Sequence, residues 1–127
     1  MTNSFLVTSS QYKMNNFLEG ENIFVFDIET NGLYNDVNEI FCLVIFDVNR
    51  QQTFTYGPDR IADALEHLAN AHVLIGHNII FYDLPVIRKL YPFYTFKAPH
   101  IIDTLICTRL IWPKELLTEL DATYHFD

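Results

Sequence analysis

The sequence contains few of the residues that mark secreted, disulfide-linked or membrane-spanning proteins. Among its 127 residues are only two cysteines, Cys42 and Cys107, and both lie inside apolar segments, where a packed and reduced thiol is the expected state. No apolar run approaches the roughly 18 residues of a membrane-spanning helix. The N-terminus also lacks the basic and apolar regions of a signal peptide. We therefore expect a cytoplasmic protein with no disulfide framework, no thiolate zinc site and no membrane contact.

Basic residues are also scarce. Eight Lys and Arg residues stand against sixteen Asp and Glu residues, so the formal net charge is −8. That sign opposes binding of nucleic acid through neutralisation of its phosphates. Any role on nucleic acid would therefore need cations from another source, either bound metal ions or a basic partner.

Apolar residues are plentiful, since 50% of the sequence is hydrophobic, and this is enough for the core of one domain. The chain contains no internal repeat, no low-complexity tract and no linker rich in Gly, Ser or Pro. We expect a poorly defined N-terminal arm over residues 1–20 and a single domain over residues 21–127.

The apolar patterns predict a mixed sheet covered by helices, an α/β fold. Three strands joined by short turns, an antiparallel meander, are expected at residues 23–29, 40–47 and 53–57. Helices and strands then alternate, with strands at 72–76 and 101–102 and helices beginning at 58, 84 and 104. This order is typical of a sheet with helices packed on it.

The stretch "NIFVFDIETNGL" places two carboxylates at the end of a predicted buried strand. Asp27 and Glu29 are two residues apart, so on an extended strand they point to the same face, about 7 Å apart along the chain. Carboxylates so placed repel each other unless they are well solvated or share a cation, and hard divalent cations are the usual occupants. The pair is thus a candidate metal site.

Asp83, in "GHNIIFYDLP", is the second candidate. It lies just beyond a predicted buried strand, where sites in open sheets commonly collect. An Asp before Leu-Pro is also an ordinary helix N-cap. On this stretch alone, both interpretations stay open.

Three stretches taken together resemble one known family. "FDIETNGL" resembles the first motif, Asp-x-Glu, of the DEDD superfamily of 3′→5′ exonucleases, and "HNIIFYD" resembles the second, with Asn, three residues and Tyr-Asp. With "IIDTLICTRLIWP" after them, residues 23–113 look most like the N-terminal proofreading exonuclease domain of family A DNA polymerases of short-tailed bacteriophages. The resemblance implies a ribonuclease H-like fold, C-terminally incomplete here, which agrees with the predicted order of elements.

The resemblance also implies roles for the three carboxylates. Asp27 would bridge two divalent ions, Mg²⁺ or Mn²⁺, Glu29 would bind one of them, and Asp83 would hold the second mainly through its water shell. The ions, about 4 Å apart, would activate a water molecule and stabilise the leaving 3′ oxygen at the end of single-stranded DNA. Bound metal would also turn an acidic cluster into a phosphate site.

Four further residues would line the substrate site by the same resemblance. Thr30 and Leu33 would contact the terminal nucleotide, with Leu33 as a wedge beside the last base, and Asn78 and Tyr82 would line the pocket. The alternatives are that Leu33 and Tyr82 belong to the core and that Thr30 and Asn78 serve turns. The sequence leaves both open.

Other polar residues are interpreted as structural. Asp103 in "IIDTLI" lies where a helix N-cap belongs, and the matching Asp-Thr of the family is outside its metal site, so we expect a cap and not a fourth ligand. The five histidines show no metal-ligand spacing. We expect ordinary structural contacts for them.

The family's third motif, Tyr-x-x-x-Asp or His-x-x-x-x-Asp on a late helix, is not found. After Pro113 only Tyr124 and Asp127 come near it, and they are spaced one residue short. One ion would then lack a carboxylate and the attacking water its orienting group, so we expect a chain that is weak or inactive alone. We also expect an uncovered apolar patch, and association with a completing polymerase chain or with a second copy.

Two functions from different classes remain. The first is part of a phage-type exonuclease completed by another chain, favoured by the two intact motifs. The second is a small phage protein that uses this fold as a non-catalytic binding or inhibitor module against a host or defence protein, favoured by the charge of −8 and the missing motif. A third interpretation makes the carboxylates caps and solvated turns.

Overall fold

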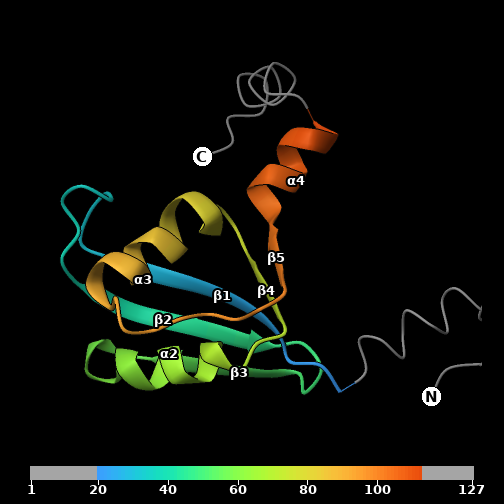
Figure 1. Ribbon diagram of the computed structural model, residues 1–127, viewed down its shortest axis with the longest axis horizontal. Helices are drawn as coiled ribbons and strands as arrows, with labels where there is room; N and C mark the ends of the chain where they lie inside the picture. The colour runs from blue at the N-terminus through green and yellow to red at the C-terminus, as the bar shows by residue number, and fades with distance from the viewer. Residues whose placement is uncertain (1–19, 113–127) are drawn as a thin grey trace, which may run out of the picture.

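The computed structural model describes residues 20–112, and within this range five strands form one sheet with helices around it (Figure 1). The strands are β1 (Ile23–Thr30), β2 (Ile40–Asp47), β3 (Gln52–Tyr56), β4 (Val73–Gly76) and β5 (His100–Asp103). The helical segments are η2 (Pro58–Arg60), α2 (Ile61–Ala69), η3 (Ile79–Asp83), α3 (Leu84–Leu90) and α4 (Thr104–Ile111). The predicted strands and helices are therefore confirmed, with most bounds shifted by no more than one residue.

The sheet is mixed and has β1 at its centre, with the strand order β3-β2-β1-β4-β5. β1 pairs with β2, and β2 with β3, in antiparallel register, which forms the predicted meander. β4 runs parallel to β1, and β5 parallel to β4. The α/β fold class is thereby confirmed, and the order of elements is consistent with a ribonuclease H-like fold.

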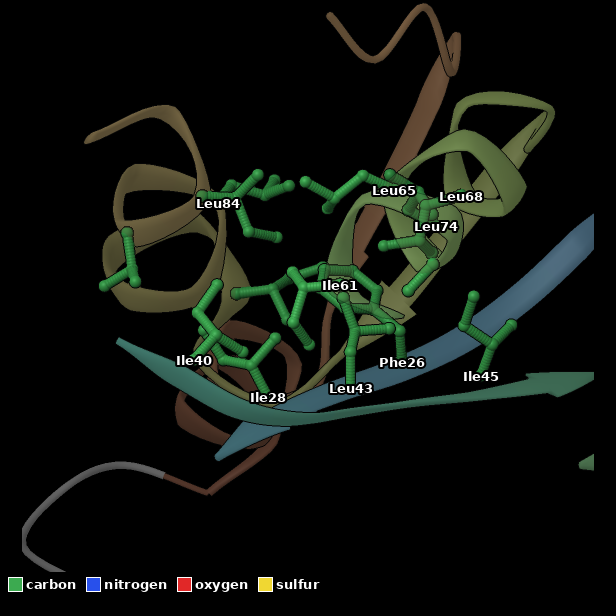
Figure 2. Close-up of a cluster of buried hydrophobic side chains, with 14 of the residues drawn as sticks. Phe26, Ile28, Ile40, Leu43, Ile45, Ile61, Leu65, Leu68, Leu74 and Leu84 are labelled. Carbon is green, nitrogen blue, oxygen red and sulfur yellow. The ribbon is translucent and has the colours of Figure 1, made fainter. Parts of the chain in front are cut away.

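The core lies between the sheet and the helices α2 and α3 (Figure 2). Because side chains alternate along a strand, Phe26 and Ile28 of β1 and Leu43 and Ile45 of β2 point to this face, and all four are buried. Leu65 of α2 packs against them from the helix side. Burial of this layer fixes the orientation of β1. The alternate residues of the strand, starting with Asp27, must therefore point to the opposite face of the sheet.

β4 separates from β1 at Gly76. The parallel pairing of the two strands ends at Val25 and Ile75. A Cβ atom at Gly76 would lie 2.9 Å from the carbonyl oxygen of Phe26 and would overlap the side chain of Ile79. Only glycine permits so close an approach, and the backbone of β1 beyond this point is left without a strand on that side.

The segment after β4 differs most from its prediction. The apolar pattern predicts neither helix nor strand for residues 77–83, but Asn78 adopts a left-handed conformation with φ 60° and residues 79–83 form η3, a single π-helical turn. π-helical turns are rare and occur often at functional sites. The π-helical form of η3 therefore marks it as a candidate functional segment.

The sheet face opposite α2 and α3 carries apolar side chains near the β5 edge. A cavity of about 480 Å³ lies there, lined by Ile23, Val73, Ile75, Pro99, His100, Ile101 and Ile102. Ile101 and Ile102 are each 42% exposed.

Across residues 20–112, no helix has both the length and the apolar character needed to cross a lipid bilayer.

Candidate functional site

β1 presents Asp27 and Glu29 on the sheet face opposite α2 and α3, where both are exposed. Their direction follows from the alternation of the strand, because Phe26 and Ile28 fill the core. The two carboxylates therefore share one face and meet solvent.

Asp83 ends η3 and reaches the edge of β1 that β4 leaves open. It is only 4% exposed, and its Oδ2 accepts a hydrogen bond from the backbone N–H of Ile28 at 3.2 Å. Asp83 precedes α3 but makes no side-chain bond that caps the helix. Asp83 thus stands at the N-cap position of α3 without capping it through its side chain, and its carboxylate instead joins η3 to the strand that carries Asp27.

Asp83 and Asp27 interact electrostatically. Burial raises the pKa of the Asp83 carboxyl most, and the negative charge of Asp27 raises it further. The hydrogen bond from Ile28 favours the ionised form and offsets them only in part, so the pKa of Asp83 reaches about 7. Near neutral pH this carboxyl is therefore partly protonated, and a cation beside the two acids would favour its ionised form.

The Tyr82 hydroxyl connects η3 to the loop that follows β1. It donates to the carbonyl oxygen of Gly32 at 2.5 Å and lies 2.5 Å from Thr30 Oγ1. Tyr82 also packs partly against the core. Leu33, which follows Gly32 in the loop after β1, is 77% exposed and so does not belong to the core. The structure thus brings Thr30 and Tyr82 together and leaves the Leu33 side chain exposed to solvent.

A profile of the RNase H superfamily matches residues 24–124. The match includes β1 with its two carboxylates and η3 with Asp83. The chain belongs to the RNase H superfamily. This membership supports a nuclease-like function. None of the curated proteins compared with the chain matches it.

Nucleases of the RNase H superfamily generally use divalent metal ions, and the carboxylates of this chain fit such an ion in part. Within residues 20–112, no three Asp, Glu, His or Cys side chains are grouped closely enough to hold a metal. Asp27, Glu29 and Asp83 thus do not form the compact set of three that the sequence resemblance implies. Mg²⁺, however, keeps several waters and is commonly bound by one or two carboxylates together with substrate phosphates. The oxygen donors of Asp27 and Asp83 fit that chemistry.

Asn78 and Asp103 meet at the start of η3. Asp103 caps α4 as predicted, since its side chain accepts from the N–H of Leu105. The same carboxylate also accepts from the N–H of Asn78 at 2.8 Å and of Ile80 at 3.0 Å. Asn78 itself makes the left-handed turn before η3, which is the turn role left open by the sequence.

Lys89 has a role at the site that no sequence pattern predicts. Its ammonium group donates to the carbonyl oxygens of Tyr34 at 2.6 Å and of Asn35 at 3.3 Å. These contacts attach the loop that carries Leu33 to α3. The partners are more than fifty positions away in the sequence, so no local motif could have shown them.

Two histidines make structural contacts away from the acids. His67 packs edge-on against Phe54, and its Nδ1 lies 2.8 Å from the Tyr56 hydroxyl. Burial lowers the pKa of His67. His72 Nδ1 accepts from the backbone N–H of Asn22 at 2.8 Å. Both rings therefore make contacts that stabilise the fold.

Proposed function

We propose that this chain supplies the acidic site of a 3′→5′ exonuclease of the proofreading type, as in phage-type DNA polymerases, acting on the 3′ end of single-stranded DNA. One observation carries the proposal. Asp27 of β1 and Asp83 of η3 come from distant parts of the sequence, yet their charges interact and Asp83 is bonded to the residue next to Asp27. Burial of an acid beside a like charge is costly and is typical of functional sites.

Each acid has its own task in this proposal. When bound, Mg²⁺ or Mn²⁺ would supply an activated water and stabilise the departing 3′ oxygen. Asp27, which is exposed, would hold the ion on the open face of the sheet. Asp83 would give up its proton as the cation binds. Because its pKa is about 7, we expect activity to rise with pH through this region.

The loop after β1 would position the terminal nucleotide. Leu33 is exposed there and is suited to contact the last base as an apolar wedge. Hydrogen bonds from Tyr82 to Gly32 and from Lys89 to Tyr34 hold the backbone on both sides of Leu33. A wedge must be rigid to separate a base from its neighbour, and these two anchors would provide that rigidity.

A further acidic or orienting group is needed to complete the reaction. Residues 20–112 hold no group of three metal-binding side chains. We infer that the additional group comes either from the rest of the chain or from a partner, which would be a completing polymerase chain or a second copy. The chemistry expected of this chain by itself is therefore weak.

A non-catalytic binding module directed at a host or defence protein is the second candidate. The net charge of −8 and the apolar cavity at the β5 edge favour it, because both suit contact with another protein. This candidate gives no reason for the interaction between Asp27 and Asp83, and we therefore rank it second.

The proposal is tested by titrating Mn²⁺ and Mg²⁺ into the purified chain and then incubating it with 3′-labelled single-stranded DNA. The wild type is compared with Asp27→Asn and with a matched control, Glu66→Gln. Glu66 is an exposed acid on α2, which covers the opposite face of the sheet. We expect Asp27→Asn to lower the trimming rate by at least about a hundredfold and Glu66→Gln to leave it unchanged.

Each outcome has a separate meaning. Metal binding that depends on Asp27 but produces no trimming would support an acidic site that awaits its completing group. Equal trimming by all three proteins would refute the role of Asp27. Metal binding that is absent or independent of Asp27 would favour the binding module.

A further inference from the structure

Asp103 connects the end of β5 to the segment that carries Asp83. Its side chain is 3% exposed and accepts three backbone N–H groups. Oδ1 accepts from Asn78 at 2.8 Å and from Leu105 at 2.9 Å, and Oδ2 accepts from Ile80 at 3.0 Å. Two of these donors belong to the start of η3 and the third to α4.

The start of η3 needs such a partner. Asn78 has a left-handed backbone, which Asn adopts more readily than most residues with a side chain, but the first N–H groups of any helical segment lack partners within it. A π-helical turn of five residues gains little from its own hydrogen bonds. The conformation of residues 78–83 is therefore set by contacts from outside the segment, and the Asp103 carboxylate supplies two of them.

A second contact reinforces the same junction. The Thr104 hydroxyl lies 3.0 Å from His77 Nδ1 and 3.3 Å from the carbonyl oxygen of Gly76. Thr104, the first residue of α4, is thus attached both to Gly76, the last residue of β4, and to His77, which follows it. The orientation of α4 and the path of η3 depend on one another.

We propose that Asp103 is a positioning residue for the acidic site: it fixes the start of η3 so that Asp83 reaches the N–H of Ile28 beside Asp27. The geometric part of this proposal concerns the fold alone. Its consequence for metal binding rests on the proposed function. Asp103 binds no metal itself in this proposal and acts through the backbone of residues 78–83.

The test uses Asp103→Asn in the full chain. The amide oxygen can still accept from Asn78 and Leu105, but the amide nitrogen then faces the N–H of Ile80, and that hydrogen bond is lost. Asp47→Asn is the matched control. Asp47 is equally buried and also accepts a backbone N–H, that of Arg50, but it pairs with the opposite end of β1.

Two measurements separate positioning from simple destabilisation. The first is hydrogen exchange of the Ile28 amide, which reports whether Asp83 stays in place and requires no metal. The second is Mn²⁺ affinity. After correction for global stability, we expect Asp103→Asn to raise the exchange rate of Ile28 about tenfold and to weaken Mn²⁺ binding about tenfold, while Asp47→Asn changes neither. An Ile28 exchange rate equal in the two variants would overturn the proposal.

Two further experiments keep the proposal testable if Asp103→Asn does not fold. Asp103→Ser retains a hydroxyl that can cap α4 but cannot reach Asn78 and Ile80 together, and the same increase in exchange is expected. In the wild type, the amides of Ile28 and Ile80 should become exposed in one opening event with the same dependence on denaturant. Opening in separate events would refute the coupling. A wild-type chain whose Mn²⁺ binding is absent or unaffected by Asp27→Asn would instead refute the proposed function and leave the exchange result standing.

Discussion

Replacing Asp83 with asparagine should stabilise the protein at alkaline pH. The amide oxygen can accept from the Ile28 N–H as the carboxylate does. The variant therefore imitates the protonated acid. It keeps the hydrogen bond and removes the charge that burial and Asp27 disfavour.

The sign and size of the effect follow from the pKa of Asp83. Folding raises it from 3.8 to about 7, so the folded state holds the proton more tightly, and the contribution of Asp83 to wild-type stability falls as pH rises from about 4 to about 7 and then levels off. Each tenfold difference in proton affinity is worth about 1.4 kcal/mol, which gives about 4 kcal/mol for the full displacement. The charge of Asp27 that contributes to this shift is exposed and screened by solvent, so we expect a gain of about 2 kcal/mol at pH 8.

Urea unfolding of the wild type and of Asp83→Asn at pH 5 and pH 8 measures this gain directly. At pH 5 the difference should shrink to less than about 1 kcal/mol. At pH 8, Mg²⁺ or Mn²⁺ should stabilise the wild type and not the variant, because a cation relieves the repulsion that the variant has already lost. A variant that is less stable than the wild type at pH 8, or a difference that does not change with pH, would refute the reasoning.

Three other substitutions test contacts around the site. Gly76→Ala should lower the free energy of unfolding by about 2 kcal/mol in urea titrations, because the added Cβ meets the backbone of β1, while Gly57→Ala, where nothing lies within 4 Å, should be nearly neutral. Tyr82→Phe should cost about 1 kcal/mol in thermal unfolding and should also slow trimming of DNA, since its hydroxyl holds the loop after β1. Arg50→Ala should cost about 2 kcal/mol at pH 7, because it leaves the buried Asp47 unpaired. Burial alone would raise the pKa of Asp47, but the hydrogen bonds and charge of Arg50 lower it. The loss of stability caused by Arg50→Ala should therefore vanish as pH falls below 3.8. A loss of equal size in acid would show that the pair of Arg50 and Asp47 is not responsible.

The strands and helices could be predicted because their apolar residues follow the period of each element. β2 has the predicted bounds, and the short turns on either side of it required an antiparallel meander. Alternation along β1 likewise placed Asp27 and Glu29 on one face once the core side was known. These features depend on neighbours in the sequence, which is why the sequence alone could show them.

Features made by distant residues could not be predicted in the same way. The π-helical turn η3 begins after Asn78 and lies against Gly76 and Asp103, which belong to different elements. The bond from Ile28 to Asp83 depends on where β4 leaves β1, and no local pattern shows that point. Asp27, Glu29 and Asp83 do not form a compact group of three, and this too depends on where their side chains lie in space.

The place of β4 in the chain also predicts the order in which Asp27 and Asp83 come together during folding. β1, β2 and β3 are connected by short turns, whereas β4 must find β1 across a long stretch of chain. Nearby contacts form faster than distant ones, because closing a longer loop costs more conformational entropy. We therefore expect the meander that carries Asp27 to form first, and Asp83 to join it after β4 has paired with β1. A partly folded chain would then present Asp27 without Asp83 beside it, so the raised pKa of Asp83 would be a property of the completed sheet alone.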